Sequence, residues 1–174
     1  VVLHPSSHAT YYPGAQSMTM KVLFSPASGK ILGAQIVGFD GVDKRIDVLA
    51  SAMQAGMTAA DLEALDLSYA PPYSSAKDPV NYAGYVIENI RTGLVVQFHH
   101  DIIPKIQEME DAVLLDVRTA EEFAAGHIRG ALHLPQTELR ERIAELDSGK
   151  RYFVYCQSGV RSYAACRILQ AHGI

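Results

Sequence analysis

Tyr152-Phe153-Val154-Tyr155-Cys156-Gln157-Ser158-Gly159-Val160-Arg161 is the stretch of sequence that decides the fold. Its first four residues are aromatic or β-branched and predict a short strand, whereas residues 162–171 carry apolar side chains at helical spacing. The order is therefore strand, loop, helix, with Cys156 at the start of the loop. Backbone amides and the positive end of a helix dipole both favour an anion at that place. We expect a lowered pKa for the Cys156 thiol and a nucleophilic thiolate.

The other residues of this loop also favour negative charge. Gly159 allows backbone angles that a side chain would resist, and Arg161 adds a charge that does not titrate near neutral pH. The spacing between Cys156 and Arg161 is one residue shorter than in cysteine-dependent phosphatases, so the cradle suits a terminal persulfide sulfur better than a phosphate. Two other interpretations stay open. Cys156 is a small apolar residue at a strand end, or the loop binds an oxyanion as in a phosphatase or arsenate reductase.

A second block upstream predicts the same architecture. Residues 113–117 form an apolar, β-branched run typical of a buried strand. Thr119 and Glu122 have the spacing of a capping box, so a helix is expected to begin directly after that strand and to end near Gly126. Alternation of strand and helix predicts an α/β domain with a parallel sheet.

Three ordered motifs in this region resemble a rhodanese-type sulfurtransferase domain, over residues 97–174. They are DVRTAEEF (116–123), GHIRGALHLP (126–135) and CQSGVRS (156–162). The resemblance implies a small α/β domain whose cysteine accepts a sulfane sulfur, becomes a persulfide and passes the sulfur to an acceptor. It implies catalytic roles for Cys156 and Arg161. It also implies a persulfide cradle made of Gln157, Ser158, Gly159, Val160 and Ser162, the last of which opens the following helix.

Other family positions in this domain are interpreted as structural. Asp116, Arg118 and Glu122 are expected to fix the loop after the strand through charge-assisted hydrogen bonds. His127 is expected to be a turn residue bonded to the backbone. Because Ile174 follows directly on a helix, where such a domain normally continues with another strand and helix, we expect this domain to be incomplete at its C-terminal end.

Residues 1–92 predict a different, α+β domain. Residues 16–24 and 31–37 alternate in polarity around a Ser-Pro-rich turn, as in a β-hairpin. A helix is expected over 42–57, a second one capped by Thr58 and Asp61, and a third from Asp78-Pro79 to about Asn89. The apolar stripe of the first helix is predicted to contain Ile46, Leu49, Ala50 and Met53.

The amino-acid sequence of this first domain resembles the C-terminal dimerisation domain of coenzyme A disulfide reductases, which belong to the pyridine nucleotide-disulfide oxidoreductase family. The matching stretches are HPSSHATYYPGA (4–15), GAQIVGFDGVDKRIDVLA (33–50) and YAPPYSSAKDPVNYAGYVIEN (69–89). The order of the two domains resembles a coenzyme A disulfide reductase fused to a rhodanese. The resemblance implies a homodimer in which Tyr11 and Tyr69 reach the partner subunit's coenzyme A site.

The resemblance further implies a whole enzyme that uses FAD and NAD(P)H to reduce coenzyme A disulfide, coenzyme A persulfide or polysulfide. The sequence has no initiator Met and no GxGxxG fingerprint, so we interpret it as a fragment without the flavin-binding region, and expect it to bind neither cofactor alone. A different hypothesis stays open, in which the chain is only an oligomerisation module and its rhodanese loop is inert or sensory.

Composition excludes several other classes. With 15 Lys and Arg against 19 Asp and Glu, the net charge of −4 disfavours nucleic acid as a partner. No apolar run approaches the roughly 20 residues of a membrane span. The two cysteines, Cys156 and Cys166, are expected to be free thiols of a cytoplasmic protein, with Cys166 packed as a small apolar residue. No metal site is expected, since residues 99–101 (His-His-Asp) are adjacent and read as a solvated linker.

Overall fold

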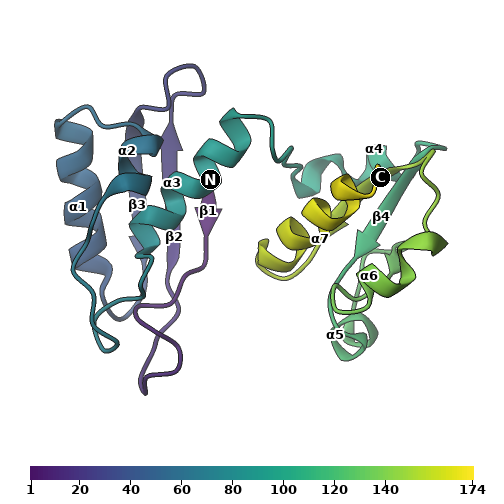
Figure 1. Ribbon diagram of the computed structural model, residues 1–174, viewed down its shortest axis with the longest axis horizontal. Coiled ribbons are helices and arrows are strands. Elements are labelled where there is room, and N and C mark those ends of the chain that lie inside the picture. The colour runs from purple at the N-terminus through teal and green to yellow at the C-terminus, as the bar shows by residue number, and fades with distance from the viewer. The chain divides into compact units, whose positions relative to one another are not determined.

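The computed structural model describes all 174 residues, which divide into two compact units, Val1–Val96 and Gln97–Ile174. Figure 1 shows both units, coloured along the chain. Each unit has its own hydrophobic core and is described by itself. None of the helices combines the length and the apolarity that a membrane crossing requires.

The first unit is built on the predicted β-hairpin. Strands β2 (Thr19–Phe24) and β3 (Ile31–Val37) pair antiparallel, and β1 (Val2–Leu3) adds to the free edge of β2. Met20 and Val22 alternate with exposed residues along β2 and are fully buried, because side chains of a strand point to opposite faces of the sheet in turn. The hairpin therefore has one face committed to the core.

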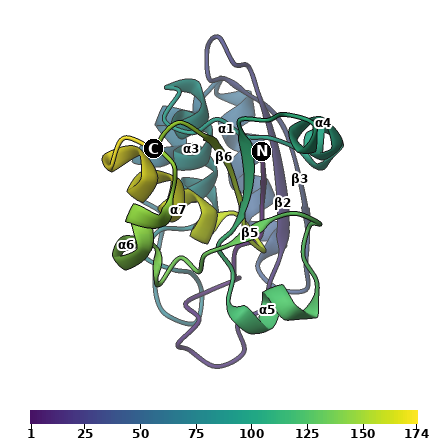
Figure 2. The same ribbon diagram turned by 90° about the vertical axis from the view of Figure 1, so that its right-hand side faces the viewer.

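Three helices cover that face of the sheet (Figures 1 and 2): α1 (Val42–Gln54), α2 (Ala59–Ala64) and α3 (Pro79–Arg91). The predicted caps are present. Thr58 and Asp61 form a reciprocal capping box at α2, and the Asp78 carboxylate accepts from the Val80 amide at the start of α3. These side chains satisfy amides that the first helical turn leaves without partners.

The predicted stripe of α1 is wrong in part. Leu49 is buried as expected, but Ala50 and Met53 are exposed and Ile46 is only half-buried, whereas Arg45 and Ala52 lie in the core. A charged side chain in that position hides the periodicity on which the prediction depended. The helix also ends earlier, at Gln54, because the following turn contains Gly56 in the left-handed region, at φ +68°.

Arg45 is buried because its guanidinium is fully used by polar partners. Its Nε donates to Asp78 Oδ2 at 3.1 Å, Nη1 to the carbonyl of Gly41 at 3.0 Å, and Nη2 to the carbonyl of Ser7 at 2.7 Å. The Ser74 hydroxyl donates to the same Asp78 carboxylate at 2.7 Å. This Arg45–Asp78 pair therefore ties α1 and α3 to the loop before β2.

The second unit contains a three-stranded parallel sheet in the order β5-β4-β6, as the alternating pattern predicts. The strands are β4 (Ala112–Asp116), β5 (Leu132–His133) and β6 (Arg151–Tyr155). In the register of β4 and β6, Asp116 lies opposite Tyr155. The carboxyl ends of these two strands are neighbours, so the loops that follow them meet at one edge of the sheet.

Four α-helices complete this unit: α4 (Ile103–Gln107), α5 (Ala120–Ala125), α6 (Leu139–Arg142) and α7 (Val160–Ala171), with 3-10 turns at His100–Ile102 and Ile143–Glu145. Figure 2 shows α6 and α7 together on one side of the sheet. The buried Leu139 of α6 and the buried Ala165, Ile168 and Leu169 of α7 belong to the same core cluster as Leu115 of β4. The predicted capping box of Thr119 and Glu122 begins α5 immediately after β4.

Candidate functional site

Cys156 lies directly after β6, and its Sγ atom points toward the first turn of α7. The amides of Gly159 and Ser162 donate to Sγ over 3.2 and 3.4 Å, and the Ser162 hydroxyl lies 3.5 Å from it. Gly159 adopts φ +99°, as its predicted conformational freedom requires. The helix begins at Val160 rather than at the predicted Ser162, because the turn at Gly159 already gives Val160 helical backbone angles.

Opposing effects act on the acidity of this thiol. Burial would raise the pKa of Cys156, but hydrogen bonds from the hydroxyl and amide of Ser162 and from the amides of Ser158 and Gly159 outweigh it. The pKa is therefore lowered from the ordinary value of a thiol, in the predicted direction. A larger thiolate fraction makes Cys156 a better nucleophile near neutral pH.

Arg161 contributes less to this lowering than the hydrogen bonds do, although its charge and that of the Cys156 thiolate favour each other. Its two terminal nitrogens donate to the Glu122 carboxylate at 2.6 and 2.8 Å. Together with the Thr119 amide, which donates to Glu122 at 2.9 Å, this pairing lowers the pKa of Glu122 to about 2. Arg161 thus links the first turns of α5 and α7, and Glu122 has the structural role predicted for it.

Some of the residues predicted to form the persulfide cradle also act on the cysteine sulfur itself. The backbone of Ser158, Gly159 and Ser162 lowers the pKa of the Cys156 thiol. Gln157 and Val160 belong to the same turn but make no hydrogen bond to Sγ, and the Val160 side chain is 73% exposed. The backbone groups that lower the pKa of the thiol therefore come from three of the five predicted cradle residues, and two of them, Gly159 and Ser162, donate to Sγ.

A cavity of about 330 Å³ opens beside the thiol, and its wall contains residues of three segments. The lining residues are Arg118, Gly126, His127, Ile128, Tyr155 and Cys156. His127 is held as predicted, by a hydrogen bond between its Nδ1 and the carbonyl of Phe123 at 2.9 Å. Tyr155 was missed from the sequence, although its position directly before Cys156 at a strand end placed it at this edge.

One lining residue of the cavity, Arg118, forms an ion pair with a buried aspartate. Asp116 is fully buried, and Arg118 donates to both of its carboxylate oxygens. Burial would raise the pKa of Asp116, but the hydrogen bonds from Arg118 outweigh it and the pKa is lowered. The Tyr155 hydroxyl accepts from the Ile128 amide at 3.2 Å and so holds the opposite wall.

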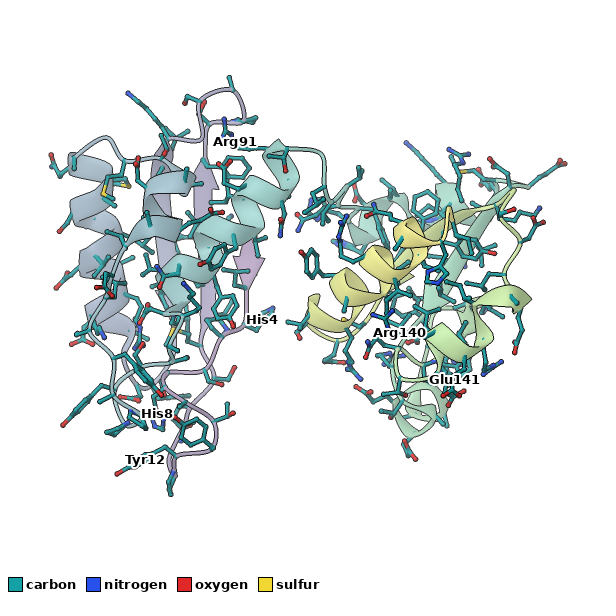
Figure 3. All side chains as sticks on the ribbon, viewed as in Figure 1. His4, His8, Tyr12, Arg91, Arg140 and Glu141 are labelled. Carbon is teal, nitrogen blue, oxygen red and sulfur yellow. The ribbon has the colours of Figure 1, made fainter.

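The first unit has a cavity of its own, of about 370 Å³, lined in part by Tyr11 and Tyr69. The hydroxyl groups of these two tyrosines are hydrogen-bonded at 2.7 Å, which raises the pKa of Tyr69. His8 also lines this cavity and contacts Tyr12 edge to face; Figure 3 labels both at one end of the unit. The structure therefore brings together the two tyrosines that the sequence singled out 58 residues apart.

Replacing Ser162 with alanine is expected to raise the pKa of Cys156, because it removes a hydroxyl that stabilises the thiolate. The rate of Cys156 alkylation by iodoacetamide should fall about threefold at pH 7, and its pH profile should move to higher pH. Ser158→Ala is the matched control, since the Ser158 hydroxyl makes no hydrogen bond to the sulfur. Equal profiles for Ser162→Ala and the wild type would contradict this assignment.

The turns of the parallel sheet lack the features by which dinucleotide cofactors are commonly bound. Such cofactors need a glycine-rich turn between a parallel strand and a helix. The turn after β4 contains the Asp116–Arg118 pair, and the turn after β6 contains Cys156. No three side chains of His, Cys, Asp or Glu come together as a metal site would require.

Comparison with known families assigns both units. Residues 101–174 match the rhodanese-like domain, and residues 1–79 match the pyridine nucleotide-disulphide oxidoreductase dimerisation domain. The two matches follow one another in the order that the resemblance of the motifs implied, with the dimerisation domain first and the rhodanese-like domain second.

Two solved structures match nearly the whole chain, and a curated relative matches part of it. Reduced CoADR-RHD of Bacillus anthracis is 47% identical and superposes with a TM-score of 0.93 over 99% of this chain and 31% of its own. A NAD-dependent persulfide reductase from A. fulgidus is 42% identical, with a TM-score of 0.85 over 100% of this chain and 31% of its own. The coenzyme A disulfide reductase of Staphylococcus aureus (strain bovine RF122 / ET3-1) is 46% identical over 79 residues, or 45% of this chain and 18% of that protein. This chain thus spans less than a third of each relative.

Proposed function

We propose that this chain works in a FAD- and NAD(P)H-dependent reductase of coenzyme A disulfide, coenzyme A persulfide or polysulfide, and that Cys156 carries sulfane sulfur within it. The names of the relatives support the class of reaction. The observation that carries the role of Cys156 is its lowered pKa beside an open cavity, with amides donating to its sulfur. Perturbed thiols in such places are typical of catalytic cysteines.

The chemistry of this role needs two displacements. The Cys156 thiolate attacks the sulfane sulfur of a donor, a new S–S bond forms, and the donor leaves with the electron pair of the broken bond. A second thiolate then attacks the outer sulfur, takes it as its own persulfide, and releases the Cys156 thiolate. The amides of Gly159 and Ser162 stabilise the negative charge that returns to the cysteine in this step.

The first unit is assigned a supporting role in the same proposal. Through it the protein forms a homodimer, and Tyr11 and Tyr69 contact coenzyme A in the partner subunit's site. Their hydrogen-bonded hydroxyls line a cavity of about 370 Å³, which supports a ligand-binding role for this end of the unit. FAD and NAD(P)H are bound by parts of the enzyme outside these residues.

An oxyanion-binding, phosphatase-like loop is the weaker alternative. A phosphatase of this type needs its arginine to bind the phosphate, but both terminal nitrogens of Arg161 are occupied by Glu122. The short spacing between Cys156 and Arg161 also disfavours phosphate binding. Hydrolysis of an aryl phosphate that depends on Cys156 would nevertheless reverse this preference.

The proposal is tested by locating sulfur on the protein. After exposure to coenzyme A persulfide, the peptide containing Cys156 is expected to gain the mass of one sulfur atom, and a coenzyme A thiol added later should remove it. Cys166→Ser is the matched control and should still load, whereas Cys156→Ser should not. Sulfur found on Cys166 alone, or on neither cysteine, would support the inert or sensory loop instead.

A further inference from the structure

We propose that Arg118 is a substrate-recognition residue, which binds a negatively charged group next to the reacting sulfur of the compound that meets Cys156. The inference rests on the proposed function for the identity of that compound as a sulfur donor or acceptor. Arg118 follows β4, Cys156 follows β6, and both line the same cavity of about 330 Å³. The two residues therefore face one bound molecule.

The hydrogen bonds of the guanidinium leave one nitrogen available. Nε donates to both oxygens of Asp116 at 3.0 and 3.1 Å, and Nη2 donates to Asp116 at 2.6 Å and to the Gly126 carbonyl at 2.7 Å. Nη1 makes no hydrogen bond to the protein, yet every buried polar side-chain atom has a partner. Nη1 is therefore accessible and offers two N–H donors.

The position of this nitrogen is fixed in advance. Asp116 is fully buried and grips the guanidinium on one side, and the carbon at the centre of that group lies 5.7 Å from the ring centre of Tyr155. Tyr155 is itself held by the Ile128 amide. A planar guanidinium held in this way loses little conformational freedom when a ligand binds, so its remaining donors are well suited to a carboxylate or sulfonate.

Arg161 does not compete for this role. Its terminal nitrogens are paired with Glu122, and it does not line the cavity. Because Asp116 balances the charge of Arg118, recognition depends on the directed donors of Nη1 rather than on net charge. The ligand class is a small sulfur compound that carries an anionic oxygen group, such as a carboxylate or sulfonate, near its reacting sulfur.

The test compares two reagents of nearly equal size on Cys156. Iodoacetate carries a carboxylate next to its reactive carbon and iodoacetamide carries a neutral amide. With both, the thiolate forms an S–C bond and iodide leaves. The ratio of the two rates, read on the Cys156 peptide by mass spectrometry, cancels changes in thiol acidity. In Arg118→Lys the ratio of the iodoacetate rate to the iodoacetamide rate should fall about fivefold. The lysine ammonium stays paired with Asp116 and lacks the second set of N–H donors that the guanidinium offers.

A second variant keeps the test sound if the first folds poorly. Asp116→Asn with Arg118→Gln removes both buried charges together and should lower the ratio by a similar factor. Arg129→Gln, an exposed arginine that does not line the cavity, should leave the ratio within twofold of the wild type. An unchanged ratio in both Arg118 variants overturns the inference even if Cys156 takes up sulfur. A fall in the ratio supports it even if Cys156 takes up none, which would count against the proposed function alone.

Discussion

Replacing Arg45 with methionine is expected to lower the free energy of unfolding of the first unit by about 3–5 kcal/mol. The change leaves the Asp78 carboxylate, which is 2% exposed, without its main partner, and it strands the carbonyls of Ser7 and Gly41. Lys44 lies 3.9 Å from Asp78 and is a third exposed, so it partly compensates the charge of Asp78. We therefore expect a loss of stability near the lower end of this range. Folded domains have only about 5–15 kcal/mol in total, so much of that stability is lost.

Hydrogen exchange followed by mass spectrometry measures this loss of stability separately for each of the two units. Peptides from β2 and β3 should lose protection in Arg45→Met, whereas peptides from β4 report on the other unit. Asp78→Asn added to Arg45→Met removes the unpaired charge, and asparagine still caps α3, so at least half of the loss should be recovered. If the double variant is no more stable than the single one, the buried charge is not the cause.

Replacing Arg118 with methionine is expected to reverse the effect of acid on the second unit. In the wild type the Asp116 pKa is lowered, so its contribution to stability is complete above the unfolded pKa of about 4 and is lost as the pH falls through the folded pKa. Without Arg118 burial dominates and raises that pKa. The variant should be about 3 kcal/mol less stable at pH 7, and part of this difference should disappear between pH 7 and pH 4, as Asp116 takes up a proton.

Protection of β4 amides at several pH values follows this reversal directly, with exchange rates corrected for their own pH dependence. Asp116→Asn combined with Arg118→Met is the control, since it has no carboxylate to titrate and its deficit should stay constant over the same range. A deficit in Arg118→Met that is also constant from pH 7 to pH 4 would show that Asp116 is not the titrating group.

The local elements were predictable wherever short-range chemistry decides them. The alternation in β2, the capping boxes at Thr58 and Thr119 and the strand-loop-helix order around Cys156 all depend on neighbours within a few residues, and all are present. The stripe of α1 could not be predicted, because the burial of Arg45 depends on Asp78, which is 33 residues away.

The direction of the Cys156 pKa shift and the contribution of the loop amides were predictable, but the pairing of Arg161 was not. The helix and the tight turn do lower its pKa, yet the charge of Arg161 is taken up by Glu122, 39 residues earlier. Such a pairing becomes visible only when α5 and α7 are placed in space. The positions of Tyr155 and Arg118 in the cavity wall also depend on the three-dimensional structure, because the register of β4 and β6 brings the ends of these strands together.

Ser162 has a single hydroxyl proton and two acceptors, the Gly159 carbonyl at 3.0 Å and the Cys156 sulfur at 3.5 Å. While the sulfur keeps its own proton, the hydroxyl is free to stay on the carbonyl, and once the sulfur is negative the hydroxyl gains more by turning to it. The Ser162 hydroxyl therefore lies within reach of both a backbone carbonyl and the sulfur, and a charge on the sulfur makes the two acceptors compete for one proton.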